Sequence, residues 1–262
     1  MRHALDPADR AKLTSAYHAM RFVEDGMAVG LGTGSTAAWL VKLLGARKHI
    51  EGLDIETVST SEVTESLARK VGLVTTNLNE AEWLDLTIDG ADEFDPALCL
   101  IKGAGGALLR EKIVATSSDR MIVISDPSKQ VEQLGQFPLP VEVVQFGVES
   151  TANMIRERLA NADVEDDRIE LRIRDGDAYE TDEGHFILDL YLNQIGDVDA
   201  LAADLLSVPG VVETGLFIDI ADTVVVGAAT GEADLIRAGE PPEVRDDMDE
   251  ARLDAFLTHI GT

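Results

Sequence analysis

Residues Ile101–Ile113 read IKGAGGALLREKI, which predicts a glycine-rich loop that leads into a helix. Gly103, Gly105 and Gly106 can adopt positive φ angles and let a ligand approach bare backbone. Ala107–Ala115 contains apolar residues and no Pro or Gly, which is typical of a helix. The N–H groups and the positive dipole end at the start of such a helix suit a phosphate or a developing oxyanion.

Two charged side chains accompany this loop. Lys102 adds a positive charge at its entrance, and Glu111 is a carboxylate further into the helix, where it can act as a base. The alternative is a tight strand-to-helix turn with an ordinary surface lysine and glutamate, because short motifs also match by chance. This stretch alone leaves both interpretations open.

A second loop of the same kind lies nearer the N-terminus. Met27–Leu31 is a short apolar strand, Gly30–Thr36 reads GLGTGST, and Ala37–Leu44 is expected to be helical. A strand, a glycine loop and a helix again make an anion site. A nucleotide-binding P-loop would require lysine after Gly34, and the dinucleotide fingerprint would require glycine in place of Ser35.

The side chains of this second loop favour a phosphomonoester over a nucleotide. Thr33, Ser35 and Thr36 place hydroxyl groups next to backbone N–H groups. The alternative is an ordinary helix cap, because serine and threonine are common at helix N-termini. These residues alone leave both interpretations open.

An acidic cluster and a lysine follow two further strand ends. The sequence DGADE follows the strand expected at Leu84–Ile88, at the edge where open α/β sheets bind ligands. Its Asp89 and Asp92 could form a hard-metal site, bind sugar hydroxyls and transfer protons, or make an acidic turn. Lys129 ends the sequence DPSK after the strand expected at Met121–Ser125.

Strands and helices alternate through the first half of the chain, which predicts a mainly parallel sheet. The sequence LGQFPLP, with its two prolines, marks a boundary. Beyond it a βαββαβ order predicts a small ferredoxin-like domain. The expected fold class is therefore α/β, an open Rossmann-like sheet with a smaller α+β ferredoxin-like domain. Helices are expected at Asp6–Phe22, Ser61–Val71, Ser150–Ala160 and Val198–Leu206, and further strands at Asp54–Val58, Leu73–Thr76, Val141–Gln145, Ile169–Arg174, Phe186–Leu192 and Val211–Val212.

Three late segments complete the expected organisation. Thr214–Phe217 and Thr223–Ala228 are expected to return to the first sheet. Pro242–Ile260 is acidic with a helical apolar stripe, which indicates a peripheral helix. The expected domains are residues 1–134 with 210–238 for the Rossmann-like catalytic domain, 135–209 for the small domain, and 239–262 for the acidic helical tail.

The chain is strongly acidic. Its 22 Lys and Arg residues against 49 Asp and Glu residues give a formal net charge of −27. Such a field repels nucleic acid and anionic membranes, so neither is an expected partner. The acidic residues are spread along the chain, which indicates a solvated surface and, as a hypothesis about habitat, adaptation to high cytoplasmic salt.

Other features limit the class of protein further. The sequence contains no run of about 18 apolar residues, so no membrane span is expected. Met1–Arg10 lacks the apolar core of a signal peptide. A cytoplasmic location is therefore expected. Cys99 is the only cysteine, which excludes an internal disulfide and a thiolate metal cluster. The five histidines are isolated in sequence and show no spacing typical of a metal site.

Five blocks, GLGTGSTA, DGADE, IKGAGGALLREKI, SDPSKQV and LGQFPLPVEV, resemble the ribose-5-phosphate isomerase A family in order and spacing. VPGVVETGLF is similar to a late segment of that family, and the resemblance covers about residues 10–230. It implies interconversion of D-ribose 5-phosphate and D-ribulose 5-phosphate in non-oxidative pentose phosphate metabolism, without a metal or organic cofactor. It also implies a homodimer or homotetramer. One departure is Ala104, where the family's loop often has glycine, so Ala104 must adopt an ordinary φ.

The resemblance also assigns roles to residues of this sequence. Glu111 is the implied proton acceptor, and one carboxylate can carry a proton between C2 and C1 through an enediolate. Lys102 and loop N–H groups can stabilise the enediolate oxygen. Ring opening is assigned to Asp89 with Asp92 assisting, and the two roles could be exchanged. The implied substrate contacts are Thr33, Gly34, Ser35, Thr36, Asp89, Gly90, Ala91, Asp92, Lys102, Gly103, Ala104, Gly105, Lys129 and, by a looser alignment, Lys12.

Two other classes of function remain open from the sequence. Sugar-phosphate sensor domains of some repressors have a similar fold, but they carry a DNA-binding helix-turn-helix that is not found in this sequence. A second alternative is another sugar-phosphate enzyme of this fold, such as a deaminating isomerase or an acyl-transfer enzyme. A sensor need not retain a base at Glu111, and an assay of ribose 5-phosphate against glucosamine 6-phosphate would separate the enzymes.

Overall fold

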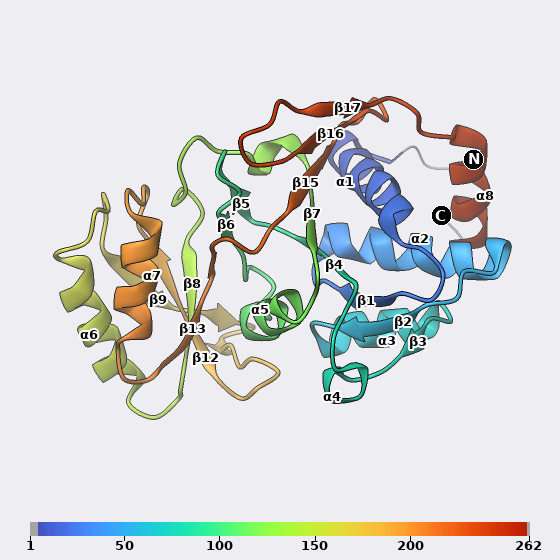
Figure 1. The fold of residues 1–262 in the computed structure, drawn as a ribbon. Helices are drawn as coiled ribbons and strands as arrows, with labels where there is room; N and C mark the ends of the chain where they lie inside the picture. Colours follow the sequence, from blue (N-terminus) through green and yellow to red (C-terminus); the bar gives the residue numbers. More distant parts are fainter. Residues whose placement is uncertain (1–4, 261–262) are drawn as a thin grey trace. The chain divides into compact units, whose positions relative to one another are not determined.

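A computed structural model describes residues 5–260. The expectation about Met1–Arg10 therefore falls partly outside the described residues. By its internal contacts the chain divides into two compact units (Figure 1). The first unit contains the described residues up to Gly90, residues 113–129 and residues from 220 onward, and the second contains residues 91–112 and 130–219.

The first unit is built on a sheet whose strand order is β17-β16-β15-β7-β4-β1-β2-β3. The strands from β3 to β15 are parallel, and β16 and β17 are antiparallel additions. This confirms the mainly parallel, Rossmann-like sheet, with the strand order reversing at β1 and β4. The strands are β1 Ala28–Leu31, β2 Glu56–Ser59, β3 Val74–Thr75, β4 Leu86–Gly90, β7 Met121–Ser125, β15 Thr223–Gly227, β16 Ala233–Ile236 and β17 Glu243–Arg245.

The helices of this unit follow the local signals of the sequence. Asp6 caps α1 by accepting a hydrogen bond from the N–H of Asp9, at 2.8 Å, as expected for this position. Helix α2 runs further than expected because Gly45 packs against Val71 inside the helix, and Gly52 in the left-handed region (φ 80°) ends it. The helical elements are α1 Pro7–Ala19, η1 Met20–Phe22, α2 Ser35–Glu51, α3 Glu62–Lys70, α4 Leu78–Ala81, η2 Pro127–Lys129 and α8 Glu250–Ile260.

The C-terminal segment differs from the expected peripheral tail. It adds the strands β16 and β17 to the large sheet before helix α8 begins. Leu253 and Phe256 of α8 are fully buried in the same core as α1 and α2, which α8 joins in Figure 1. The expectation of a peripheral helix over Pro242–Ile260 is therefore wrong, because its apolar stripe closes the core instead of covering the surface.

The second unit contains an antiparallel sheet of order β13-β8-β12-β9 with two helices. This is the order of a ferredoxin-like βαββαβ motif and confirms the expected small α+β fold. A short hairpin, β10 with β11, extends from it. The elements are β8 Leu139–Val143, α6 Val148–Leu159, β9 Arg168–Leu171, β10 Ile173–Arg174, β11 Asp177–Ala178, β12 Phe186–Tyr191, α7 Val198–Leu206 and β13 Val211–Thr214.

A small sheet of three strands completes the second unit. Its strands are β5 (Glu93–Phe94), β6 (Leu100–Ile101) and β14 (Leu216–Phe217), with β6 in the middle. The expectation that Thr214–Phe217 returns to the first sheet is wrong, because Leu216 and Phe217 pair with Ile101 and Leu100 instead. Of the two segments expected to return, the one that contains β15 joins the large sheet.

The two compact units divide the chain at other positions than the expected domains. The division falls inside helix α5 (Leu108–Thr116), whose first five residues belong to the second unit. Whether the chain folds as separate domains with boundaries near residues 134, 209 and 239 stays a prediction.

Candidate active site

In the first unit, Asp89 is the polar centre of the loops that follow β1 and β4. Its side chain is fully buried, and Oδ1 accepts hydrogen bonds from the N–H groups of Thr33 (3.0 Å) and Gly90 (2.7 Å). A Cβ atom on Gly32 would overlap the Asp89 carboxyl group, so this position requires glycine. The carboxylate and the glycine loop therefore fix each other at the sheet's switch point, the usual place for a ligand in such a fold.

The hydroxyl group of Thr33 is used inside the protein. It lies 2.7 Å from Oγ1 of Thr60 and 2.8 Å from Oγ of Ser61, and Thr64 completes the cluster. Because its N–H also bonds to Asp89, both polar groups of Thr33 hold the loop. The sequence pattern did not predict this cluster, which combines residues from two loops and helix α3.

The next residues of the loop are more accessible. Gly34, with φ 114°, precedes the first residue of α2, and both Gly34 and Ser35 are exposed while Thr36 is half-buried. The first N–H groups of a helix have no partner within it. The start of α2 therefore offers an anion site formed by backbone N–H groups and the hydroxyls of Ser35 and Thr36.

Two predicted lysines belong to the first unit. Lys129 ends η2 directly after β7, and its N–H donates to the Asp126 carbonyl at 3.2 Å. Lys12 lies on α1 with Asp9 as its ion-pair partner at 3.7 Å. This contact is an ordinary ion pair along one helix, so the role of Lys12 as a substrate contact stays a prediction.

In the second unit, Lys102 and Glu111 form a buried ion pair. Nζ of Lys102 lies 3.4 Å from Oε2 of Glu111, and the two side chains are 2% and 3% exposed. Lys102 directly follows β6, and its N–H donates to the Gly215 carbonyl at 2.9 Å. Its ammonium group also lies 5.4 Å from the centre of the Phe217 ring. Because burying two charges is costly, such a pair between a loop lysine and a helix glutamate indicates a functional demand.

The glycine loop between these two residues has positive φ angles at two of the three glycines named in the sequence, and Gly105 is not among them. Gly103 and Gly106 have positive φ angles of 112° and 85°. Ala104 is not among the non-glycine residues with positive φ, so it adopts the ordinary φ that the sequence analysis required. Its N–H donates to Oδ2 of Asp92 at 2.8 Å, which ties the acidic cluster to the loop.

Residues that the sequence analysis missed hold the carbonyl groups of this loop. Nη1 of Arg172 donates to the carbonyls of Gly103 at 2.7 Å and Ala104 at 3.3 Å, and the same guanidinium forms a two-pronged pair with Asp189. The hydroxyl of Tyr179 lies 3.3 Å from the Gly105 carbonyl. Three successive carbonyls therefore face cationic or hydroxyl donors.

Helix α5 is fixed on both sides of Glu111. Arg110 pairs with Glu183, and Nζ of Lys112 lies 2.7 Å from Oε1 of Glu213. Lys112 also donates to the carbonyl of Thr214 at 2.8 Å. Burial lowers the pKa of Lys112, and its hydrogen bond to Glu213 opposes that effect. These anchors limit rotation of the helix turn that carries Glu111.

The predicted site residues therefore form two groups, each inside one unit. Among residues 5–260 no group of three or more His, Cys, Asp or Glu side chains is arranged to hold a metal ion. Within the same range, none of the helices has both the length and the apolar character needed to cross a membrane. The first group contains Lys12, Thr33, Gly34, Ser35, Thr36, Asp89, Gly90 and Lys129, and the second contains Ala91, Asp92, Lys102, Gly103, Ala104, Gly105 and Glu111.

Comparison with known proteins gives consistent matches. Residues 56–231 match the family model described as ribose 5-phosphate isomerase A (phosphoriboisomerase A). A ribose-5-phosphate isomerase A from Dinoroseobacter shibae is 58% identical over 231 residues, 88% of this chain and 89% of the relative. One from Ruegeria sp. is 53% identical and covers 98% of both chains.

Solved structures agree with these sequence matches. The chain is similar to ribose 5-phosphate isomerase A from Methanocaldococcus jannaschii, with a TM-score of 0.80 and 35% identity over 87% of this chain and 98% of that one. It is also similar to a D-ribose-5-phosphate isomerase in complex with phospho-erythronic acid, with a TM-score of 0.81 and 37% identity over 88% of this chain and 99% of that one.

The fold, the buried acid–lysine pair and these matches define the chain as a sugar-phosphate isomerase. Within that class the chain belongs to the ribose-5-phosphate isomerase A family. The alternative of a sensor domain without catalysis is therefore wrong, because the similarity extends over nearly the whole length of enzymes.

Proposed function

We propose that the chain interconverts D-ribose 5-phosphate and D-ribulose 5-phosphate by proton transfer at Glu111. The observation that carries this proposal is the buried pair of Glu111 with Lys102, at 3.4 Å. The adjacent glycine loop is fixed by a hydrogen bond from Arg172 to the carbonyl of Gly103. A carboxylate so placed has few other uses, because burial of a charge without function is costly.

The proton transfer requires one base and one source of positive potential. Glu111 removes the proton from C2 of the open-chain aldose, and the electrons form the enediolate with its negative charge on the C1 oxygen. The same carboxyl group returns the proton to C1, while the proton of the C2 hydroxyl moves to the C1 oxygen and leaves the ketone at C2. Lys102 and the loop N–H groups stabilise the negative oxygen of the enediolate. Moving the proton in either direction uses the same groups, which accounts for interconversion with no added cofactor.

Binding and ring opening use the remaining residues. The phosphate group binds at the start of α2, at Ser35 and Thr36, with Lys129 adding a positive charge. Local N–H groups and this lysine offset the repulsion from the acidic surface. Asp89 transfers the proton that opens the sugar ring, and Asp92 supports the glycine loop through the Ala104 N–H.

The direct test is the substitution Glu111→Gln, which keeps the size of the side chain and removes the base. Loss of a general base lowers kcat by roughly 10²–10⁴-fold. Pentose phosphate binding, measured by isothermal titration calorimetry, should persist. Glu157→Gln is the matched control, because Glu157 is an exposed glutamate of helix α6 in the same unit and lies outside the anchors of helix α5. Near-normal turnover of Glu111→Gln would remove the assignment of the base.

Three broader properties are part of the same proposal. We propose adaptation to high salt, because 49 acidic residues repel one another when the counterions are dilute. Thermal denaturation should then show lower stability in dilute buffer than in concentrated KCl, and equal stability would contradict it. We also propose a cytoplasmic location, which fractionation of the source cells would test.

We further propose a homodimer or homotetramer. Phe146 of the second unit is 94% exposed, so its ring is available for a contact with another copy of the chain. Light scattering after size exclusion should give a multiple of the 28.2 kDa chain mass. The substitution Phe146→Asp should lower that multiple if this side chain lies in the contact, and a monomeric wild type would refute the proposal.

A further inference from the structure

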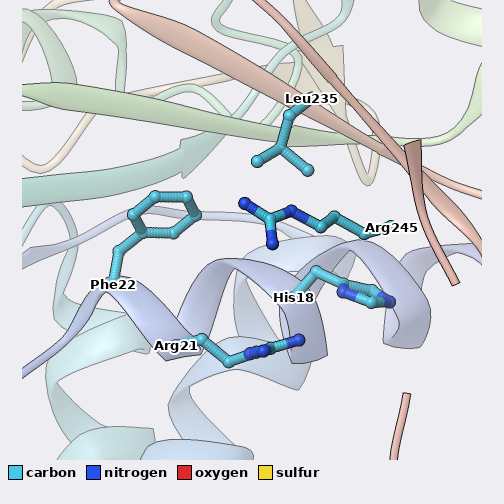
Figure 2. Close-up of a pocket in the computed structure, with 5 residues that line it drawn as sticks. All are labelled: His18, Arg21, Phe22, Leu235 and Arg245. Atoms are coloured by element: carbon cyan, nitrogen blue, oxygen red, sulfur yellow. The ribbon is translucent and has the colours of Figure 1, made fainter. Parts of the chain in front are cut away.

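A pocket lined by two arginines lies in the first unit, formed by α1, η1, β16 and β17 (Figure 2). Its volume is about 200 Å³, below the roughly 300–1,000 Å³ of sites for drug-sized ligands. A small ion therefore fits this space better than a nucleotide or a sugar phosphate. The lining residues are His18, Arg21, Phe22, Leu235 and Arg245.

Two guanidinium groups supply the charge of the pocket. Figure 2 shows the guanidinium of Arg245 directed into the space between Phe22 and Leu235. Nη1 of Arg21 lies 2.7 Å from Asp247, and Nη2 of Arg245 pairs with Glu243. Each arginine carries five N–H donors, so these pairs leave donors for a ligand. The carboxylates of Asp247 and Glu243 balance the two guanidinium charges, so the pocket is not net negative although the chain has a net charge of −27.

His18 adds an unsatisfied polar atom to this pocket. Its side chain is 1% exposed, and Nε2 lies 3.1 Å from the Gly231 carbonyl. A carbonyl only accepts, so Nε2 carries the hydrogen and Nδ1 has the lone pair of the neutral ring. Nδ1 is buried without a hydrogen-bond partner in the described structure, with Asp247 3.9 Å away. The charged or titratable groups around the ring are Asp247, Arg21, Arg245 and, in edge contact, Tyr17.

The pocket lies outside the part of the chain that the family model matches. That match ends at residue 231, whereas Leu235 and Arg245 come after it, and His18 and Arg21 come before its start at residue 56. The C-terminal strands thus create a feature that the catalytic loops do not require.

We propose that this pocket binds a small oxyanion of the size of phosphate, which receives hydrogen bonds from Arg21, Arg245 and Nδ1 of His18. Planar guanidinium groups match the oxygens of such an anion, as in other arginine sites. An anion also attracts a proton to Nδ1, which then becomes a donor. Binding joins α1 to β17 and therefore stabilises the docked C-terminal segment.

Inorganic phosphate is the probe that tests this site, titrated at constant high KCl by isothermal titration calorimetry. The substrate site also binds phosphate groups, so two sites are expected in the wild type, and one of the two should be weakened in Arg245→Gln. Loss of one charge-assisted contact weakens binding by roughly tenfold or more. Arg69→Gln is the control, because Arg69 is an exposed arginine of the same unit that pairs with Glu65.

NMR of the His18 ring distinguishes this pocket from the substrate site. Phosphate should shift the Nδ1 resonance toward the protonated form in the wild type and in Arg69→Gln, and not in Arg245→Gln. Turnover of Arg245→Gln at saturating substrate should match the wild type, which shows that the variant is folded. A His18 resonance that phosphate leaves unchanged, or equal weakening in both variants, would overturn the proposal.

Discussion

The contact of Arg172 with the glycine loop leads to a prediction about catalysis. Arg172→Lys keeps the positive charge and the partner of Asp189 but removes the planar fork. One ammonium nitrogen cannot span Asp189 and the carbonyls of Gly103 and Ala104 as the guanidinium does. The loop should therefore lose its fixed orientation while the fold is retained.

The contacts set the size of the effect. The Arg172–Gly103 bond is short, at 2.7 Å, whereas the bond to Ala104 is long, at 3.3 Å, and contributes little. A charge-assisted bond contributes about 1.5–3 kcal/mol, which lowers kcat by roughly ten- to hundredfold if it is felt fully in the transition state. Arg172→Met should instead cost about 3–5 kcal/mol of stability, because it leaves the mostly buried Asp189 uncompensated.

Steady-state kinetics with ribose 5-phosphate and urea unfolding at constant KCl separate these effects. A positioning role lowers kcat in Arg172→Lys with little change in KM. Arg168→Lys is the control, because Arg168 is half-exposed and pairs with Glu170 in the same unit. If Arg172→Lys loses stability but keeps its kcat, the guanidinium only supports the fold and the reasoning fails.

Three further predictions concern other residues. Gly32→Ala should lower both stability, by about 1–3 kcal/mol in urea unfolding, and kcat, because the added Cβ displaces Asp89. Burial lowers the pKa of His18 from its usual 6.5. The neutral ring should therefore contribute its full stability above pH 6.5, and this contribution should decrease as the pH falls from 6.5 toward the folded-state pKa. His18→Gln should flatten that part of the curve of unfolding free energy against pH. Burial raises the pKa of Cys99 to about 11, so iodoacetamide should alkylate the folded protein at pH 8 far more slowly than the urea-unfolded chain.

Local sequence signals predicted much of the architecture. The glycine loops, the alternation of strands and helices and the βαββαβ order each depend on residues close in sequence, and the structure has all three. Lys102 and Glu111 lie within one motif, so the sequence placed both in one loop–helix segment, whereas their ion pair at 3.4 Å is seen only in the structure.

Features that depend on distant residues were not predictable in the same way. Arg172 contacts a loop 69 residues away, and no local pattern marks it. Strands β16 and β17 contain only four and three residues, which is too short for an alternating pattern to mark them as strands. His49 and His259, isolated in sequence, stack with ring centres 4.1 Å apart because helices α2 and α8 pack together.

The discontinuity of the first unit has a consequence for synthesis on the ribosome. Helix α8, the last element of the described chain, contributes Leu253 and Phe256 to the core that α1 and α2 begin. Residues 130–219 form a long uninterrupted part of the other unit and emerge earlier. The nascent chain can therefore complete the core of its Rossmann-like unit only after helix α8 has been synthesised, and until then an apolar surface is open to chaperones.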